Sequence, residues 1–451
     1  MALPGLAVRF TEVFISTQTF TTSAPQERAF LVGIEIKSGR PLMTAEDSLK
    51  ELERLADTAG LLVTGQIVQR LDHPYANTYI GPGKLEEIKI LISDLDAGIV
   101  LIDDELHPRQ QRELERYFGE EIKVIDRTAL ILDIFAQHAQ TREGKLQVEL
   151  AQLEYRLPRL TRMWTHLARQ AGGRAGGDSG GVGLRGPGET QLETDRREIG
   201  RRISHIKNQL NAVIAHRQRH RAKRRQTELK VVALVGYTNA GKSTLLNKIG
   251  DADVLSADML FATLDPTTRK VIMPGGREVL FTDTVGFIQK LPTEIVAAFR
   301  ATLEEISEAD MLIHVVDVTH SNVKAQIEAV EDTLAELEVD HLPMVVALNK
   351  ADLLAEGMNV DAQLELDHAA VMVSARSGYG IDDLLMAVEA VMAQYLKPLH
   401  VFLPYQRGDL LSLLHKRGQV DGEEHRAEGV EIYGRLPFRL FPYFEAYQLD
   451  E

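Results

Sequence analysis

Short apolar runs alternate with amphipathic segments through the first third of the chain. The apolar runs predict strands at residues 30–36, 61–68, 98–103 and 122–125. The amphipathic segments predict helices at residues 44–58, 83–96, 108–118 and 127–138. Strands that alternate with helices favour a parallel sheet with right-handed crossovers. We therefore expect a parallel α/β domain at residues 29–140, preceded by an N-terminal extension at residues 1–28.

Residues 141–228 carry two helical patterns in which apolar residues recur with sevenfold spacing. The first pattern contains Leu146, Leu150, Leu153, Leu157, Leu160 and Leu167, with Trp164 between the last two. The second contains Leu192, Ile199, Ile203, Ile206, Leu210 and Val213. Each set lies on one helix face, so we expect an antiparallel hairpin whose first helix is kinked at Pro158. Its tip, residues 172–188, has nine glycines and suits either a flexible linker or a loop that a polyanion orders.

Strand and helix patterns alternate again at residues 229–396, and a short tail follows at residues 397–451. In the tail, residues 401–403 and 430–433 predict strands and residues 408–417 predict a helix. The predicted fold class is therefore multidomain α/β. It combines an N-terminal parallel α/β domain, an antiparallel helical hairpin, a second α/β domain and a small α+β C-terminal domain.

The charge of the chain is unevenly distributed. The 451 residues carry a net charge of −15, yet residues 154–230 hold 18 Lys or Arg against 7 Asp or Glu, a net of +11. A basic insert in an acidic protein indicates a local polyanion-binding surface. Cysteine is absent, which excludes disulfides, thiol catalysis and Cys-based zinc sites. With no apolar run long enough to cross a bilayer and no secretory signal, we expect a monomeric cytoplasmic protein without a transmembrane segment.

The clearest chemical motif is a complete phosphate loop between a strand at residues 230–235 and a helix. It matches GxxxxGK[ST] and consists of Gly236, Tyr237, Thr238, Asn239, Ala240, Gly241, Lys242 and Ser243, with Thr244 next. Its backbone N–H groups and the positive end of the following helix favour a bound phosphate. Lys242 is expected to contact the β- and γ-phosphates, and the Ser243 hydroxyl is expected to bind Mg²⁺. These residues predict a P-loop domain at residues 229–396.

Two further segments complete the expected magnesium and γ-phosphate site. Asp283 ends an apolar strand and would hold Mg²⁺ through water, and the Gly286 N–H three residues later would sense the γ-phosphate. Thr263 lies between these motifs and the phosphate loop. Its hydroxyl and carbonyl would complete the coordination of Mg²⁺ when the γ-phosphate is present. Thr267 and Thr268 are nearby alternatives for this role.

The base-recognition motifs favour GTP over ATP. Asn349, Lys350 and Asp352 form an NKxD motif after a predicted strand, and Asp352 can accept hydrogen bonds from N1 and N2 of guanine. Adenine would leave that carboxylate unpaired, so such a site discriminates strongly. Ser374, Ala375 and Arg376 follow the next strand and offer a backbone N–H to the guanine O6. In this order, the motifs predict a GTPase with GTP and GDP as substrate and product.

The expected hydrolytic machinery lacks one element. Many signalling GTPases have a glutamine directly after the glycine that corresponds to Gly286. This chain has Phe287 there, and its side chain cannot orient water by hydrogen bonding. Another side chain, a backbone group, a partner or a monovalent cation must do so. Asn239 is either a K⁺ ligand or an ordinary loop residue. We expect slow intrinsic hydrolysis that a partner stimulates, with Lys242, Thr263 and Gly286 as the central catalytic groups.

With these motifs in view, the chain closely resembles the HflX family of translational GTPases over about residues 28–400. The resemblance is most specific at residues 181–197 (GVGLRGPGETQLETDRR), 236–245, 261–269 and 283–288, and it is strong at 124–127, 135–137 and 144–153. It implies binding to the large ribosomal subunit and ribosomal RNA and, in some members, splitting of ribosomes under stress. The family has a hydrophobic residue at the position of Phe287, whereas residues 172–179 extend the tip beyond the shared motif.

The basic hairpin is where the charge pattern and the resemblance meet. Candidate RNA contacts are Arg185, Arg196, Arg197, Arg201 and Arg202. The alternative is that these arginines form a solvated helix face. Two other functions stay open at this point: an RNA-remodelling or tRNA-maturation GTPase, and a regulatory GTPase that binds proteins through the hairpin.

Overall fold

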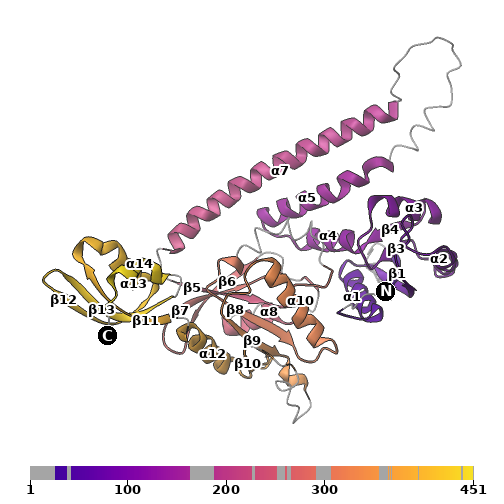
Figure 1. Ribbon diagram of the computed structural model, residues 1–451. Helices are drawn as coiled ribbons and strands as arrows, with labels where there is room; N and C mark the ends of the chain where they lie inside the picture. The colour runs from indigo at the N-terminus through magenta and orange to yellow at the C-terminus, as the bar shows by residue number, and fades with distance from the viewer. Residues whose placement is uncertain are drawn as a thin grey trace, which may run out of the picture.

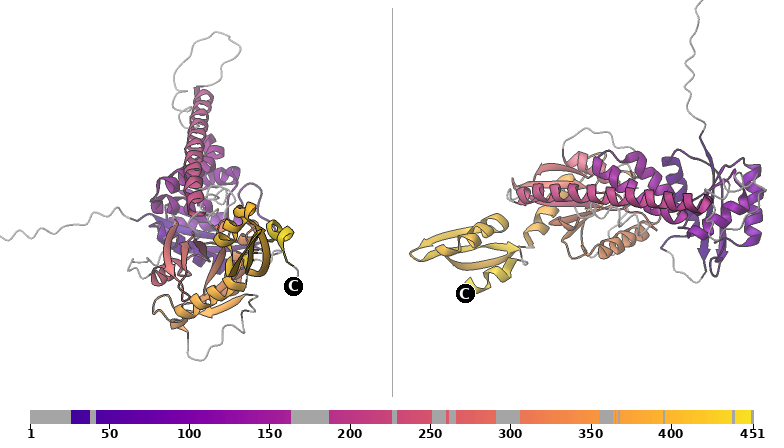
Figure 2. Two further views of the ribbon diagram at one scale, coloured as in Figure 1. Left: turned by 90° about the vertical axis from the view of Figure 1, so that its left-hand side faces the viewer. Right: turned by 90° about the horizontal axis from the view of Figure 1, so that it is seen from above.

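The computed structural model describes residues 26–37, 42–162, 187–225, 229–250, 260–261, 266–290, 306–354, 364, 366, 368–394, 396–437 and 440–449. The N-terminal domain and the C-terminal domain lie at opposite ends of an elongated molecule, and the P-loop domain lies between them (Figures 1 and 2). A pair of helices runs along one side. No helix in the described residues has the length and hydropathy that a membrane span requires.

The N-terminal domain is a four-stranded sheet whose neighbouring strands are all parallel, in the order β2-β1-β3-β4. Its strands are β1 (Arg28–Ile36), β2 (Leu62–Leu71), β3 (Ile99–Ile102) and β4 (Lys123–Asp126). Its helices are α1 (Ala45–Thr58), α2 (Pro82–Asp94), α3 (Pro108–Phe118) and α4 (Arg127–His138). Helices α1 and α4 cover one face and α2 and α3 the other, because successive strand residues point to opposite faces. The predicted parallel α/β fold is confirmed.

Two helices form the predicted hairpin. Helix α5 (Arg142–Arg156) passes into the 3₁₀ segment η1 (Leu157–Arg162), so the α-helical geometry ends just before Pro158. Helix α7 (Pro187–Arg225) has 39 residues and is therefore about 58 Å long. It lies beside α5 and runs in the opposite direction (Figure 1). The seam between them contains Leu146, Leu150, Leu153, Ile203, Ile206 and Leu210. Trp164, Leu167 and the glycine-rich tip lie outside the described residues.

The P-loop domain has a six-stranded sheet in the order β10-β9-β8-β5-β7-β6, in which only β6 runs antiparallel to its neighbour. Its strands are β5 (Lys230–Val235), β6 (Thr267–Ile272), β7 (Glu278–Asp283), β8 (Met311–Asp317), β9 (Met344–Asn349) and β10 (Ala369–Met372). The helices in its described residues are α8 (Lys242–Ile249), α10 (Val323–Glu336), the 3₁₀ turn η2 (Ala351–Leu353) and α12 (Ile381–Gln394). Helices α8 and α12 cover one face, and α10 covers part of the other.

The C-terminal domain is a three-stranded antiparallel sheet in the order β11-β13-β12. It contains β11 (Leu396–Pro404), η3 (Tyr405–Arg407), α13 (Gly408–Arg417), β12 (Gln419–Arg426), β13 (Gly429–Pro437), α14 (Phe441–Phe444) and η5 (Glu445–Tyr447). The predicted α+β class is confirmed. Strand β12 was not predicted, because Val420 is the only large apolar residue in this edge strand.

The N-terminal and P-loop domains share one buried apolar cluster. From the N-terminal domain it includes Leu49 of α1 and Phe135 of α4, and from the P-loop domain it includes Tyr237, Phe261 and Phe287. The rings of Phe135 and Phe261 meet edge to face, with centroids 4.7 Å apart and planes at 80°. The face of the central sheet opposite α8 and α12 is therefore completed by another domain.

The hairpin seam gives a first testable prediction. Ile206 is fully buried among leucines of α5 and α7, so Ile206→Ala should destabilise the pairing of the two helices by about 2–3 kcal/mol. Amide hydrogen exchange in α5 and α7 should accelerate accordingly. Asn208→Ala changes an exposed residue of the same helix and should leave exchange unaltered. Equal effects of the two substitutions would mean that the seam does not stabilise the hairpin.

Candidate functional site

The phosphate loop lies at the carboxyl end of β5, directly before α8. Gly241 precedes α8 with φ of +93°, and a Cβ there would lie 2.4 Å from Asn349 Nδ2, so only glycine fits. Lys242 is buried, and its Nζ donates to the carbonyl oxygens of Gly236 (3.0 Å) and Tyr237 (2.9 Å). Burial lowers the pKa of Lys242 to about 8, although Asp283 acts in the opposite direction. An anion next to the Lys242 ammonium would stabilise its charge in place of the water that burial excludes.

Two of the predicted magnesium ligands, Ser243 at the start of α8 and Asp283 at the end of β7, lie next to each other. Ser243 Oγ donates to Asp283 Oδ2 over 2.6 Å, which brings together a hydroxyl and a carboxylate, the oxygen donors that Mg²⁺ prefers. Thr284 Oγ1 donates to Leu234 O (2.6 Å) and so fixes the end of β7 against β5. Thr263 lies outside the described residues. Of its alternatives, Thr267 and Thr268 lie in β6, where the Thr268 hydroxyl bonds that of Thr282 (3.0 Å).

Gly286 lies directly against the phosphate loop. A Cβ at this position would lie 2.9 Å from Thr238 Cα and 3.0 Å from Lys242 Nζ, so the Gly286 backbone lies against the loop and its lysine. Tyr237 and Phe287 form a parallel bridge, in which Thr238 N donates to Phe287 O (2.8 Å) and Phe287 N to Gly236 O (3.1 Å). The phosphate loop and the segment after Asp283 are thus joined directly.

The predicted guanine-recognition residues also lie together. Asn349 joins the two loops, since its Nδ2 donates to Ala240 O (2.8 Å) and its Oδ1 accepts from Ala375 N (2.9 Å). Ser374 Oγ donates to Asp352 Oδ1 (2.7 Å) and orients that carboxylate. The Ala375 N–H is already engaged by the Asn349 side chain. Lys350 has φ of +67° and pairs with Asp317 (2.6 Å), and Arg376 is exposed.

The side chains of Tyr237 and Phe287 contact the N-terminal domain. Phe287 is 2% exposed and packs in the cluster shared with the N-terminal domain. The Tyr237 hydroxyl donates to Glu51 of α1 and accepts from Gln289 N (2.8 Å), so only the backbone of Tyr237 faces the phosphate site. Asn239 is half-buried with φ of +60° in the same loop. The motif alone gives no sign that Tyr237 serves an interdomain contact.

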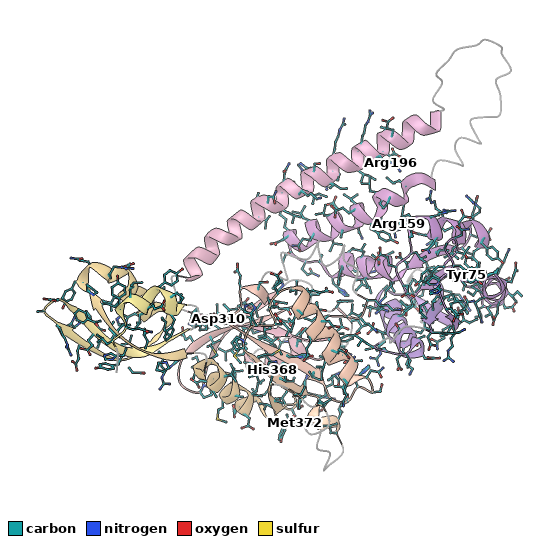
Figure 3. The ribbon with its side chains drawn as sticks, in the orientation of Figure 1. Tyr75, Arg159, Arg196, Asp310, His368 and Met372 are labelled. Carbon is teal, nitrogen blue, oxygen red and sulfur yellow. The ribbon has the colours of Figure 1, made fainter. Side chains whose placement is uncertain are left out.

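The candidate RNA-binding arginines lie on α7. Arg196, Arg197, Arg201 and Arg202 are all exposed, and Figure 3 labels Arg196 on this helix. Arg197 pairs with Glu193 of its own helix (2.7 Å), whereas Arg202 pairs with Glu149 of α5 (2.7 Å). Arg185 lies outside the described residues. Arg196 and Arg201 therefore present their charge to solvent with the least involvement in the hairpin itself.

Family models match most of residues 46–350. A model described as GTP-binding GTPase N-terminal matches residues 46–136, one described as GTP-binding GTPase Middle Region matches 138–224, and one described as 50S ribosome-binding GTPase matches 231–350. A protein described as GTPase HflX from Caldanaerobacter subterraneus is 44% identical over 410 residues, which cover 90% of each chain. The chain belongs to the HflX family of GTPases.

Other HflX relatives extend over similar lengths. The GTPase HflX of Alkalihalophilus pseudofirmus is 43% identical over 92% of this chain and 97% of its own. That of Escherichia coli is 42% identical over 91% of this chain and 94% of its own. Among solved structures, a GTP-binding protein of Sulfolobus solfataricus in complex with GDP is 24% identical, with a TM-score of 0.41, over 82% of this chain and 99% of its own.

As an HflX-family GTPase, the protein binds GTP and hydrolyses it to GDP and phosphate. The described geometry suits that activity, because the phosphate loop, the Ser243–Asp283 pair and the Asp352 carboxylate lie at the carboxyl ends of parallel strands of one sheet. The sequence did not reveal the polar residues that join this site to the N-terminal domain, among them Glu51, Arg127 and Lys290. Of these three, only Arg127 lies in a segment of strong HflX resemblance, residues 124–127, and that resemblance assigned it no function.

Base specificity can be tested at Asp352. In Asp352→Asn the side-chain amide can still accept from the purine N1–H but now donates toward position 2, a pattern that matches xanthine. GTP affinity should fall about 100-fold or more, and affinity for xanthosine triphosphate should rise. Calorimetry with both nucleotides measures this, with Asp382→Asn in the exposed first turn of α12 as the control. Unchanged GTP affinity in Asp352→Asn would remove Asp352 from the site.

The lowered pKa of Lys242 predicts proton uptake on nucleotide binding. Half of this lysine is neutral near pH 8 in the free protein, and adjacent phosphates should restore its charge. GDP binding at pH 8 should therefore take up about half a proton, and affinity should weaken as the pH rises above 8. Calorimetry in two buffers of different ionisation enthalpy measures the uptake. Lys242→Arg, which stays charged, should abolish it; equal uptake in both proteins would contradict the assignment.

Proposed function

We propose that the protein is a GTP-dependent switch that binds the large ribosomal subunit through its N-terminal domain and basic hairpin, and that it splits or rescues ribosomes. It would act as a cytoplasmic monomer. The observation that carries the proposal is the 39-residue helix α7, which projects exposed arginines from a GTPase core. A net charge of +11 over residues 154–230 of an otherwise acidic chain suits RNA phosphates. The matched description 50S ribosome-binding GTPase supports the same partner.

The nucleotide chemistry of this proposal is assigned to residues of the P-loop domain. The backbone of residues 236–244 and Lys242 hold the phosphates, and Asp352 with the turn at Ser374 holds guanine. Ser243, Asp283 and Thr263 hold Mg²⁺, which would neutralise phosphate charge. Asn239 is the proposed K⁺ ligand. GTP would order the segments around Thr263 and Gly286, and hydrolysis would release them.

Slow intrinsic turnover is part of the proposal. Phe287 is buried in the interdomain cluster, so the position that carries a catalytic glutamine elsewhere cannot reach the attacking water here. The missing group would then come from another side chain, the backbone, a monovalent cation or the ribosome. The protein is therefore proposed to hydrolyse GTP slowly by itself and faster on the large subunit.

Co-sedimentation with purified large ribosomal subunits tests this function. With a non-hydrolysable GTP analogue, the protein should bind more tightly than with GDP. Neutralising Arg196, Arg197 and Arg201 to Gln should weaken that binding about tenfold or more and reduce its salt dependence, with GTP affinity unchanged. Arg202 is left intact because it pairs with Glu149 across the hairpin.

The matched control neutralises Lys270, Arg277 and Lys324, which are exposed on the P-loop domain. It should bind subunits like the unaltered protein. Equal loss in both triple variants would reduce the effect to general charge. Binding to isolated tRNA in place of subunits would favour an RNA-maturation GTPase, and binding to neither RNA would favour a protein-binding regulator.

A further inference from the structure

The first turn of α4 contacts three parts of the molecule. It begins at Asp126, whose Oδ1 accepts from Ala129 N (2.9 Å) and caps the helix. The next residue, Arg127, is 1% exposed. These adjacent residues carry opposite charges and have different partners. Asp126 contacts the tip-side end of the first hairpin helix, and Arg127 contacts the P-loop domain.

Arg127 faces the nucleotide-binding domain. Its guanidinium pairs with Glu51 of α1 and with Asp103 at the end of β3 (Nη1–Oδ1, 2.7 Å). Burial disfavours its charge, but these two carboxylates outweigh burial and raise the pKa of Arg127. Its Nη2 also donates to Gln289 O (3.1 Å), in the segment that follows Gly286. A buried charge in this position is stable only while all of its partners stay in place.

The Gln289 backbone is held on both sides by this network. Its N–H donates to the Tyr237 hydroxyl (2.8 Å), which in turn donates to Glu51, and its carbonyl accepts from Arg127. The next residue, Lys290, reaches into the N-terminal domain and pairs with Asp103 (3.1 Å) and Asp104 (2.7 Å). A movement of the backbone at Gly286 therefore reaches Arg127 within three residues.

Asp126 contacts the end of the first hairpin helix that lies nearest the tip. Its Oδ1 also accepts from the Tyr155 hydroxyl of α5 (2.8 Å), and its Oδ2 accepts from Leu106 N (3.0 Å) and lies 3.5 Å from Arg159 Nη2. Arg159 of η1 stacks on the Tyr155 ring at 3.5 Å and donates to Leu106 O (2.6 Å). Figure 3 shows Arg159 where the hairpin meets the N-terminal domain. The tip-side end of α5 and η1 are thus bonded to the cap of the same helix that holds Arg127.

We propose that the Asp126–Arg127 pair couples the hairpin to the segment after Gly286, so that Asp126, Arg127, Glu51 and Tyr155 act as positioning residues for the GTPase site. The far end of α4 supports this role, because Phe135 contacts Phe261 of the segment between the phosphate loop and β6. One helix therefore touches both segments expected to respond to GTP. The consequence for ribosomes rests on the proposed function: RNA contact along the hairpin would be transmitted through α4, and nucleotide state would be transmitted back.

Hydrogen exchange of the purified full-length protein tests the coupling without ribosomes. In the unaltered protein, exchange of α5 should differ about fivefold or more between GDP and a non-hydrolysable GTP analogue. Two variants interrupt opposite ends of the network: Glu51→Gln removes the charge between Arg127 and Tyr237, and Tyr155→Phe removes only the hydroxyl that bonds Asp126. Each should reduce the difference to less than about twofold, and the double variant should add little.

Lys123→Gln provides the control, since Lys123 pairs with Glu27 on the surface of the same domain; it should keep the full nucleotide difference. GTP affinity and thermal unfolding are measured alongside to establish that each variant folds and binds nucleotide, and Tyr155→Phe, which loses a single hydroxyl, serves if Glu51→Gln folds poorly. The proposal is overturned if α5 exchanges alike with both nucleotides, or if Tyr155→Phe retains the difference. Either result would leave subunit binding, and hence the proposed function, untouched.

Discussion

A single buried cation, the Arg127 guanidinium, sets the arrangement of the N-terminal and P-loop domains. Its charge is tolerable in the interior only because Glu51 and Asp103 flank it and Gln289 O accepts from it. Two of these partners belong to the N-terminal domain and the third to the P-loop domain, so separating the domains would remove Gln289 O from Arg127 and Lys290 from Asp103 and Asp104. The apolar cluster that includes Phe287 and Phe261 surrounds the same contact. Polar and apolar interactions therefore hold the N-terminal domain on the segments that surround the nucleotide.

This arrangement explains the unusual residue after Gly286. In a GTPase whose second switch is free in solution, that position can carry a side chain for the attacking water. Here the backbone of Phe287 is bonded to Gly236 and Thr238, and its ring is buried between domains. In the proposed function, this position has no direct role in hydrolysis and makes an interdomain contact instead. The proposed slow, partner-stimulated hydrolysis is consistent with this arrangement, because the segment after Gly286 contacts the N-terminal domain, which is proposed to bind the ribosome.

The features predicted correctly from the sequence are those that depend on local patterns of residues. Alternation of apolar and polar residues located β1 and α1 through α4, sevenfold spacing located the hairpin seam, and motif spacing brought Ser243 to Asp283 and Ser374 to Asp352. The sequence did not predict the Glu51–Arg127 pair or the Tyr237–Glu51 bond, whose partners are 76 and 186 residues apart. No periodicity relates such positions, and a tyrosine in a phosphate loop looks like a nucleotide contact. Strand β12 escaped prediction because an edge strand needs few apolar residues.

The central claim is that nucleotide state at the P-loop domain is communicated to the hairpin. The absence of cysteine allows clean site-specific labelling, and the exposed residues Asn208 of α7 and Glu336 of α10 suit spin labels after substitution by Cys. The inter-label distance distribution, measured with GDP and with a non-hydrolysable GTP analogue, tests the claim most directly. We expect the distance to shift by about 2 Å or more between the two nucleotides. Superimposable distributions, with nucleotide bound in both samples, would contradict it.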